Sequence, residues 1–267
     1  MGVYSHLRNI SEMKQFKKSD TAVFLGSGPS VNEITPEQEN VINRCDKWTL
    51  NNWIYHPTIV PDFYHLELKH FNFFIFQRRM NEKRELYQNV KFFIADKDRK
   101  ITLRLPGGVT KKRAGSLIDA IGSQHPYIYY FKHRFLGKSD DRVIDANYKM
   151  KPNVITKKHV ISLTLMLEIM YKFGYKKIYL YGVDLKDSRY FWTGGDESVY
   201  GEVHQQHNKE HEGKDPDTPH TTYRIKDFVI DFNKRFMMPE DRYIFTATKN
   251  TLLYPDLEYQ NIMENVI

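Results

Sequence analysis

Five residues that follow a short apolar run could bind an anion. Residues 22–25 are apolar, and they lead directly into Gly26, Ser27, Gly28, Pro29 and Ser30. Glycine adopts backbone angles that are closed to other residues and lets a ligand approach the main chain. Successive N–H groups in such a turn, or at the start of a following helix, can hold a phosphate. The pattern therefore indicates either a phosphate-binding loop or a plain turn between a strand and a helix.

A second glycine turn carries a carboxylate. The β-branched and aromatic stretch 177–181 runs into Gly182, Val183 and Asp184. Ligands of parallel α/β sheets bind at the carboxyl ends of the strands. Because both glycine turns follow predicted strands, we expect both at the carboxyl ends of strands in one sheet.

Three histidines offer a different kind of site. His204, His207 and His211 are spaced three and four residues apart, so a helix would place them on one face. Such a face could bind a metal ion together with an acidic residue. The acidic residues in the same stretch are Glu202, Asp215 and Asp217. The stretch has few apolar residues, which is the pattern typical of a solvated, flexible loop.

Several common enzyme motifs are missing from the chain. No P-loop lysine follows the first glycine turn, which argues against a Walker-type kinase. The dinucleotide spacing G-x-G-x-x-G lacks its third glycine, because Val31 or Asn32 stands in that place. A G-x-S-x-G elbow, which would indicate a serine hydrolase, does not occur.

The elements that must position these residues alternate along the chain. Strands are predicted at 21–25, 47–50, 62–66, 90–95, 177–181 and 243–247, and helices at 30–43, 69–86, 156–173 and 222–236. This order predicts an α/β protein, a single Rossmann-like domain over 1–267 with a mostly parallel central sheet. Residues 96–153 and 186–220 have weaker patterns, and we expect them to be inserted lid segments.

Composition and charge indicate which kinds of ligand and which cellular compartment to expect. The formal net charge of +7 favours an anionic ligand, while no RRM, zinc-finger or helix-turn-helix signature points to nucleic acid. The single cysteine, Cys45, excludes an internal disulfide. Residues 1–18 lack the apolar core of a signal peptide, so a cytoplasmic location is expected. Residues Phe71 to Arg79 are rich in aromatic and basic side chains, which fits either peripheral membrane contact or a buried amphipathic helix.

Several segments together carry a family resemblance. They are the Gly26–Ser30 turn, Asn51 and Asn52 after the second strand, Ser162, the stretch 173–180, the Gly182–Asp184 turn, Tyr190 and the pair Ile225-Lys226. In this combination the chain resembles the bacterial sialyltransferases of glycosyltransferase family 42, and more distantly the pterin diphosphokinase-like and motility-accessory proteins. The resemblance implies a GT-A-like variant of the Rossmann-like fold and a homo-oligomer.

The resemblance also implies a reaction. An acidic sugar, sialic acid or a related nonulosonic acid, would move from a CMP-sugar donor to a glycan acceptor. The residues expected to bind the nucleotide are Gly26, Ser27, Gly28, Pro29, Ser30, Asn51, Asn52, Ser162, Gly182 and Asp184. Hydroxyl and main-chain N–H groups can hold the single phosphate of CMP, so we expect no metal and no cofactor.

Three residues are implied in catalysis. His220 lies just before Ile225-Lys226, where the family has its general base, and an imidazole with a pKa of about 6.5 suits that task. Tyr190 and Lys186 would stabilise the charge that develops on the leaving phosphate. The chain departs from the family at Lys186, where a tyrosine is usual, at His159 in place of an arginine, and at His65 in place of an asparagine.

Two other functions remain open from the sequence. One is a diphosphokinase-like transfer that uses ATP, a pterin and a metal held by acidic residues. The other is a non-catalytic protein that binds a nucleotide or a glycan. Nucleotide preference and magnesium dependence distinguish the three.

Overall fold

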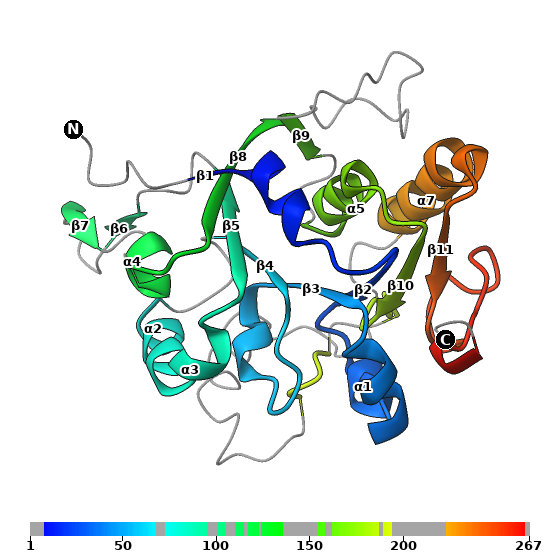
Figure 1. Ribbon diagram of the computed structural model, residues 1–267, viewed down its shortest axis with the longest axis horizontal. Helices are drawn as coiled ribbons and strands as arrows, with labels where there is room; N and C mark the ends of the chain where they lie inside the picture. Colours follow the sequence, from blue (N-terminus) through cyan, green and yellow to red (C-terminus); the bar gives the residue numbers. More distant parts are fainter. Residues whose placement is uncertain are drawn as a thin grey trace.

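A computed structural model describes residues 8–67, 73–95, 101–104, 110–114, 117–122, 124–135, 154–157, 162–186, 189–193 and 223–264. A central parallel sheet runs through these ranges, with helices on both of its faces (Figure 1). An α/β fold with a mostly parallel central sheet, as predicted from the sequence, is thereby confirmed.

The central sheet has nine strands in the order β1-β8-β5-β4-β3-β2-β10-β11, with β9 also paired to β8. Every neighbouring pair in it is parallel. The strands are β1 (Arg8–Asn9), β2 (Thr21–Leu25), β3 (Asp46–Leu50), β4 (Phe63–Leu66), β5 (Lys91–Ala95), β8 (Ile128–Phe135), β9 (Val154–Lys157), β10 (Lys177–Tyr181) and β11 (Tyr243–Thr246). A separate antiparallel hairpin joins β6 (Ile101–Arg104) to β7 (Thr110–Ala114).

The strand order places a ligand crevice at one point of the sheet. From β2 the chain moves through β3, β4 and β5 on one side, and it later returns to β10 and β11 on the other side of β2. The order β4-β3-β2-β10-β11 is that of a Rossmann sheet, in which ligands bind where the order reverses, outside the carboxyl ends of the strands. In this chain the reversal lies between β2 and β10, and both glycine turns follow these two strands.

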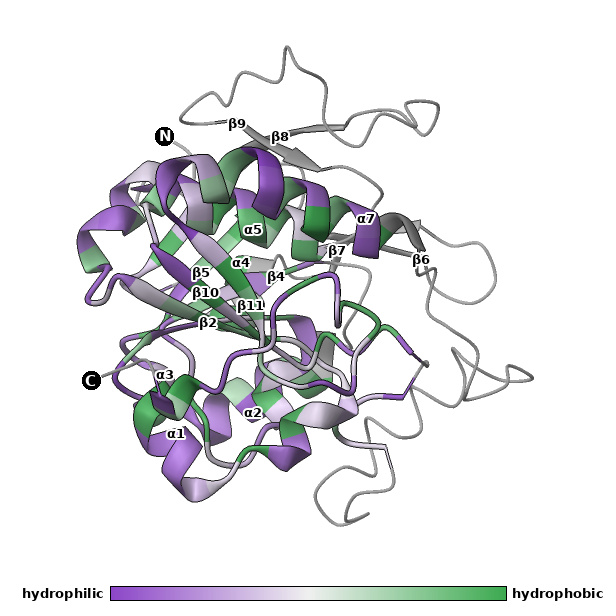
Figure 2. Cartoon of the chain, turned by 90° about the vertical axis from the view of Figure 1, so that its right-hand side faces the viewer, coloured by the Kyte–Doolittle hydropathy of each residue, from purple (hydrophilic) through white to green (hydrophobic). Residues whose placement is uncertain are grey.

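Helices cover the two faces in two separate layers (Figure 2). One layer holds α1 (Pro36–Ile42), α2 (Phe73–Glu82), α3 (Arg84–Tyr87) and α4 (Leu117–Ile121), and the other holds α5 (Ser162–Phe173) and α7 (Tyr223–Phe232). Short turns complete the chain: the 3₁₀ helices η1 (Ile10–Phe16), η2 (Pro29–Glu33), η3 (Asn51–Tyr55), η6 (Met238–Glu240) and η7 (Ile262–Glu264), and a π-helical turn, η5 (Asn233–Met237).

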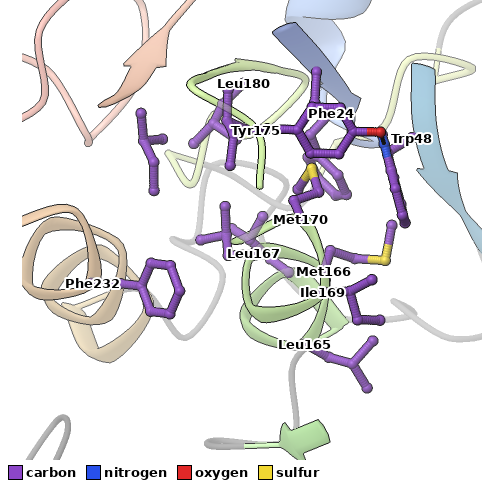
Figure 3. Packing of buried hydrophobic residues seen from close by; sticks show 14 of the residues in the cluster. Phe24, Trp48, Leu165, Met166, Leu167, Ile169, Met170, Tyr175, Leu180 and Phe232 are labelled. Atoms are coloured by element: carbon purple, nitrogen blue, oxygen red, sulfur yellow. Dashed lines mark hydrogen bonds between the residues drawn. The ribbon is translucent and has the colours of Figure 1, made fainter. Parts of the chain in front are cut away.

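The core on the α5 face surrounds a helix segment that is buried throughout. Every residue of α5 from Ser162 to Met170 is buried. Leu167 and Met170 lie beneath Leu180 and Tyr175, with Phe232 of α7 beside them (Figure 3). Such a helix resists movement, because each buried leucine or methionine stabilises the fold by roughly 1.5–3 kcal/mol. The start of α5 is therefore a rigid position for a functional side chain.

The structure corrects two expectations. The predicted helix 156–173 begins only at Ser162, and the β-branched stretch at 154–156 instead pairs with β8 as strand β9. The predicted insertion 96–153 includes helix α4 and strand β8, which pairs with β5 inside the main sheet. Their apolar residues Ile118, Ile128 and Phe131 are buried in the two cores. Sequence patterns missed β8 because its pairing depends on distant strands. Of the second predicted lid, 186–220, only 186 and 189–193 are described.

The aromatic and basic stretch 71–79 is described from residue 73. It forms most of α2, and Phe76 is buried in the core. Within the described ranges, no helix combines the length and the apolar character needed to cross a bilayer.

His56, which follows η3, should make stability depend on pH. Its ring stacks on Trp53 with 4.5 Å between centroids, and its Nδ1 accepts the N–H of Ile59 at 3.1 Å. That bond requires an unprotonated Nδ1. Burial, with a smaller contribution from the charge of Lys83, lowers the pKa of His56 to about 4.

The direction of the effect follows from proton binding. Between about pH 6.5 and pH 4 the unfolded chain holds a proton on His56 that the folded chain lacks, so acidification favours unfolding. We expect His56 to account for a loss of roughly 2–3 kcal/mol on going from about pH 7.5 to about pH 4. Urea unfolding of the wild type and of His56→Asn, whose Oδ1 can replace Nδ1 as acceptor, measures this loss as a difference. Parallel losses in the two proteins would contradict the assignment.

Candidate functional site

The two glycine turns are bonded directly to each other. The N–H of Gly26 donates to the carbonyl of Tyr181 at 2.8 Å, and the N–H of Gly28 donates to that of Gly182 at 2.9 Å. A side chain at Gly26 would place its Cβ 2.3 Å from the Gly182 oxygen. Gly182 itself has a φ of 65°, a conformation that favours glycine. These glycines are therefore required for the close approach of two strands.

Asp184 joins the two turns through its carboxylate. Its Oδ2 accepts the N–H of Ser30 at 3.0 Å, and its Oδ1 accepts the Ser30 hydroxyl at 2.5 Å. The Ser30 oxygen in turn accepts the N–H of Gly182 at 3.1 Å. Ser30 and Asp184 are 154 residues apart in the sequence and both are buried. Asp184 thus supplies the negative charge at the start of η2 from within the protein.

These bonds leave little of the first turn free for a phosphate. The N–H groups of Gly26, Gly28 and Ser30 are donated to the second turn, and Pro29 has no N–H. The expectation that successive N–H groups of this turn hold an anion is therefore wrong for these positions. In this turn, the N–H of Ser27 is the one without an acceptor among the described residues. Ser27 is half-buried, so an incoming oxygen can reach it.

A third segment, residues 250–252, packs on the same edge, although no sequence motif marked it. The hydroxyl of Thr251 donates to the carbonyl of Val183 at 2.7 Å, and the N–H of Leu252 donates to that of Asp184 at 3.0 Å. Lys186 donates to the side chain of Asn250 at 2.7 Å. Residues 250–252 therefore hold the chain just after the second turn, where Leu185 has a φ of 59°.

A cavity borders Ser30 on the α1 face. It has a volume of about 410 Å³ and is lined by Ser30, Glu33, Gln38, Tyr181, Ala247, Thr248, Lys249 and Tyr259. The Tyr181 hydroxyl is buried without a hydrogen-bond partner within the described part of the chain. Burial also raises the pKa of Tyr181, so the hydroxyl stays protonated.

Asn51 lies at the end of the neighbouring strand in a strained conformation. Its φ is 48°, and its side chain is buried. The carbonyl of Asn51 accepts the hydroxyl of Tyr64, and its Oδ1 accepts the N–H of Glu67 at 2.9 Å. An N–H donor needs an oxygen opposite it, so this bond fixes the orientation of the carboxamide. Its Nδ2 has no acceptor among the described residues. Asn52 is half-buried in η3 beside it.

The structure adds Glu67 and His65 to this edge. The hydroxyl of Ser162, at the start of α5, donates to Oε2 of Glu67 at 2.5 Å. Nε2 of His65 lies 3.8 Å from Oε1 of Glu67. All three side chains are buried. Sequence reasoning singled out Ser162 and the substitution at His65 but missed Glu67. The residue pattern around β4 does not reveal which side chains lie at the carboxyl edge of the sheet.

The predicted catalytic residues are described only in part. Lys186 is exposed and bonded to Asn250. The ring of Tyr190 is half-buried and stacks on Trp192, with centroids 4.6 Å apart. His220 lies outside the described residues, as does His159. The pair Ile225-Lys226 is in the first turns of α7, where Ile225 is buried and Lys226 pairs with Asp256 at 2.6 Å.

The alternative metal site cannot be located on the described part of the chain. His204, His207 and His211 lie outside it, together with Glu202, Asp215 and Asp217. Within the described ranges, no group of three or more His, Cys, Asp or Glu side chains has an arrangement that could hold a metal ion.

Comparison with known proteins finds likeness among solved structures. No protein-family model and no curated protein matches the sequence. The chain is similar to the sialyltransferase CstII from Campylobacter jejuni in complex with a substrate analogue, cytidine-5'-monophosphate, at 14% identity and a TM-score of 0.47, over 91% of this chain and 86% of that one.

A second similar structure is the monofunctional α-2,3-sialyltransferase Cst-I from the same organism, at 14% identity and a TM-score of 0.48, over 94% of this chain and 84% of that one. Both are sialyltransferases, as are the proteins that the sequence motifs resemble. Because identity and TM-score are both low, the function proposed below depends on the residues of this chain.

Proposed function

We propose that the protein is a glycosyltransferase that moves an acidic sugar from a CMP-activated donor to a hydroxyl group of a glycan acceptor. One observation carries the proposal: the residues that the sequence motifs name gather at the carboxyl edge where the strand order reverses. The glycine turns after β2 and β10 meet there, and Asn51 follows the next strand. Ligands of such sheets bind at this edge.

Each residue at this edge has a different role in binding. Asn51 donates a hydrogen bond from its Nδ2 to the ligand, since its Oδ1 already accepts the N–H of Glu67. Ser27 supplies one N–H to an oxygen of the phosphate. Glycines 26, 28 and 182, with Ser30 and Asp184, build the floor of the site and fix these positions rather than contact the phosphate through the main chain.

The transfer itself exchanges one bond for another. The acceptor oxygen forms a bond to the anomeric carbon while the bond from that carbon to the phosphate oxygen breaks, and CMP leaves with the electron pair. His220 takes the proton of the acceptor hydroxyl. Lys186 and Tyr190 stabilise the additional negative charge on the departing phosphate. The ammonium of Lys186 is exposed and follows Asp184 by two residues.

A panel of nucleotides tests the proposal. We expect CMP to stabilise the protein without magnesium, by about 3–5 °C in melting temperature at ten times its dissociation constant. Melting curves with CMP, CDP, UDP, ATP and GTP, each with and without magnesium, measure this effect, and calorimetry gives the affinity. Stabilisation by ATP that requires magnesium would instead indicate the diphosphokinase-like function. No response to CMP at millimolar concentration would refute the donor assignment, and CMP binding without transfer would identify a binding protein.

A further inference from the structure

A buried polar cluster beside Asn51 determines whether the Ser162 hydroxyl can donate a hydrogen bond to a ligand or only accept one. The cluster consists of His65, Glu67 and Ser162, from the end of β4 and the start of α5. Their exposed fractions are 0%, 8% and 8%. Glu67 is tied to Asn51 through its own main-chain N–H, so the cluster and the proposed nucleotide site share a wall.

The position of the protons on His65 follows from its neighbours. Its Nδ1 lies 3.0 Å from the carbonyl oxygen of Phe93. A carbonyl only accepts hydrogen bonds, so Nδ1 carries a hydrogen. The other nitrogen, Nε2, is buried and has no hydrogen-bond partner among the described residues. It faces Oε1 of Glu67 across 3.8 Å.

The short bond between Glu67 and Ser162 has a defined direction. An ionised carboxylate carries no hydrogen and only accepts hydrogen bonds. The bond of 2.5 Å to Oε2 of Glu67 is therefore donated by the Ser162 hydroxyl.

This direction leaves Ser162 with only lone pairs to offer a ligand. A hydroxyl has one hydrogen, and that of Ser162 is committed to Glu67. The serine oxygen can accept a hydrogen bond but cannot donate one to a phosphate or carboxylate oxygen. An anion placed there would also meet the lone pairs of the serine at close range.

We propose that Ser162 accepts a hydrogen bond from a hydroxyl or amino group of the bound sugar nucleotide, and that its phosphate and its carboxylate lie elsewhere. Glu67 is then a positioning residue that determines specificity, because it holds the serine hydrogen away from the ligand. The inference rests on the proposed function and refines it. It also changes the role expected from the sequence, in which hydroxyl groups of the site hold the phosphate.

Three probes separate the parts of the ligand. Cytidine, CMP and CMP-N-acetylneuraminate add in turn the nucleoside, the phosphate and the acidic sugar, and calorimetry gives the affinity gained at each step. In Ser162→Ala we expect the phosphate step to stay within twofold of the wild type. We expect the nucleoside step or the sugar step to weaken by about tenfold, the loss of one hydrogen bond near a charged group. Ser11→Ala, an exposed serine on η1, is the matched control.

The binding step that changes in each variant decides for or against the proposal. A phosphate step that weakens in Ser162→Ala means that the serine donates to the phosphate, and it overturns the proposal. So does an unchanged affinity at every step. Glu67→Gln brings an amide that can donate to the serine and release its hydrogen. We expect the step that weakens in Ser162→Ala to weaken in this variant too, because the freed serine hydrogen opposes the donor of the ligand, while the phosphate step stays unchanged. Glu85→Gln, an exposed control on α3, should change neither step.

A measurement without any ligand keeps this proposal distinct from the proposed function. A buried hydroxyl that donates to a carboxylate gives a downfield, slowly exchanging proton resonance. We expect such a resonance in the wild type, its loss in Ser162→Ala and an upfield shift in Glu67→Gln. If the resonance is present but no CMP binds, the function is refuted while the serine orientation stands. If no such resonance exists, the orientation is wrong, whatever binds.

Discussion

Gly26→Ala is expected to destabilise the protein by roughly 3–5 kcal/mol and to abolish nucleotide binding. The added Cβ would lie 2.3 Å from the oxygen and 2.9 Å from the carbon of Gly182, and 3.1 Å from the oxygen of Tyr181. All three are backbone atoms of the adjoining strand, so no side chain can move aside. Relief requires β2 and β10 to separate, which combines overpacking with the loss of buried hydrogen bonds.

Gly174→Ala is the matched control for this variant. Gly174 has a φ of 81°, but a Cβ there meets nothing within 4 Å. The Gly174→Ala variant therefore measures only the cost of holding a non-glycine residue at a positive φ, and it should lower the free energy of unfolding by about 1–2 kcal/mol. Urea unfolding of the two variants and the wild type measures the difference. If Gly26→Ala is no less stable than Gly174→Ala, the close contact between the turns is not a structural requirement.

His220→Ala is expected to lower kcat for sugar transfer by about 10²–10⁴-fold while CMP affinity stays the same. The general base acts on the acceptor proton and not on the nucleotide, so its removal affects the transition state and leaves donor binding intact. In the wild type, kcat should fall as acidification protonates His220, because a protonated imidazole cannot accept the proton. Initial rates over a pH series, with CMP formation as the signal, measure both effects.

His6→Ala, a histidine of the N-terminal segment, is the control for loss of a histidine as such. Treatment with a chelator belongs in the same experiment. If chelation removes activity and His220→Ala retains it, the metal alternative at His204, His207 and His211 replaces the general-base mechanism. If His220→Ala loses CMP affinity in parallel with activity, the residue contributes to binding and is not the base.

Much of the local structure followed from the sequence. The strands 21–25 and 177–181 were predicted with the bounds that the structure has, because β-branched and aromatic runs followed by glycine turns are local signals. The resemblance to sialyltransferases also arose from such local motifs. The helix start at Ser162 and strand β8 were missed, because β9 and β8 exist only through pairing with strands far away in the chain.

Local sequence patterns identified the residues that follow three of the strands, which are the two glycine turns and Asn51. The sequence by itself could not determine what their polar atoms do, because hydrogen-bond partners depend on which strands become neighbours. Only the tertiary structure placed β2 against β10 and so committed the N–H groups of Gly26, Gly28 and Ser30 to protein acceptors. In the same way, only the packing of α5 on β4 brought Glu67 to Ser162, so that the serine hydroxyl donates its hydrogen to this carboxylate.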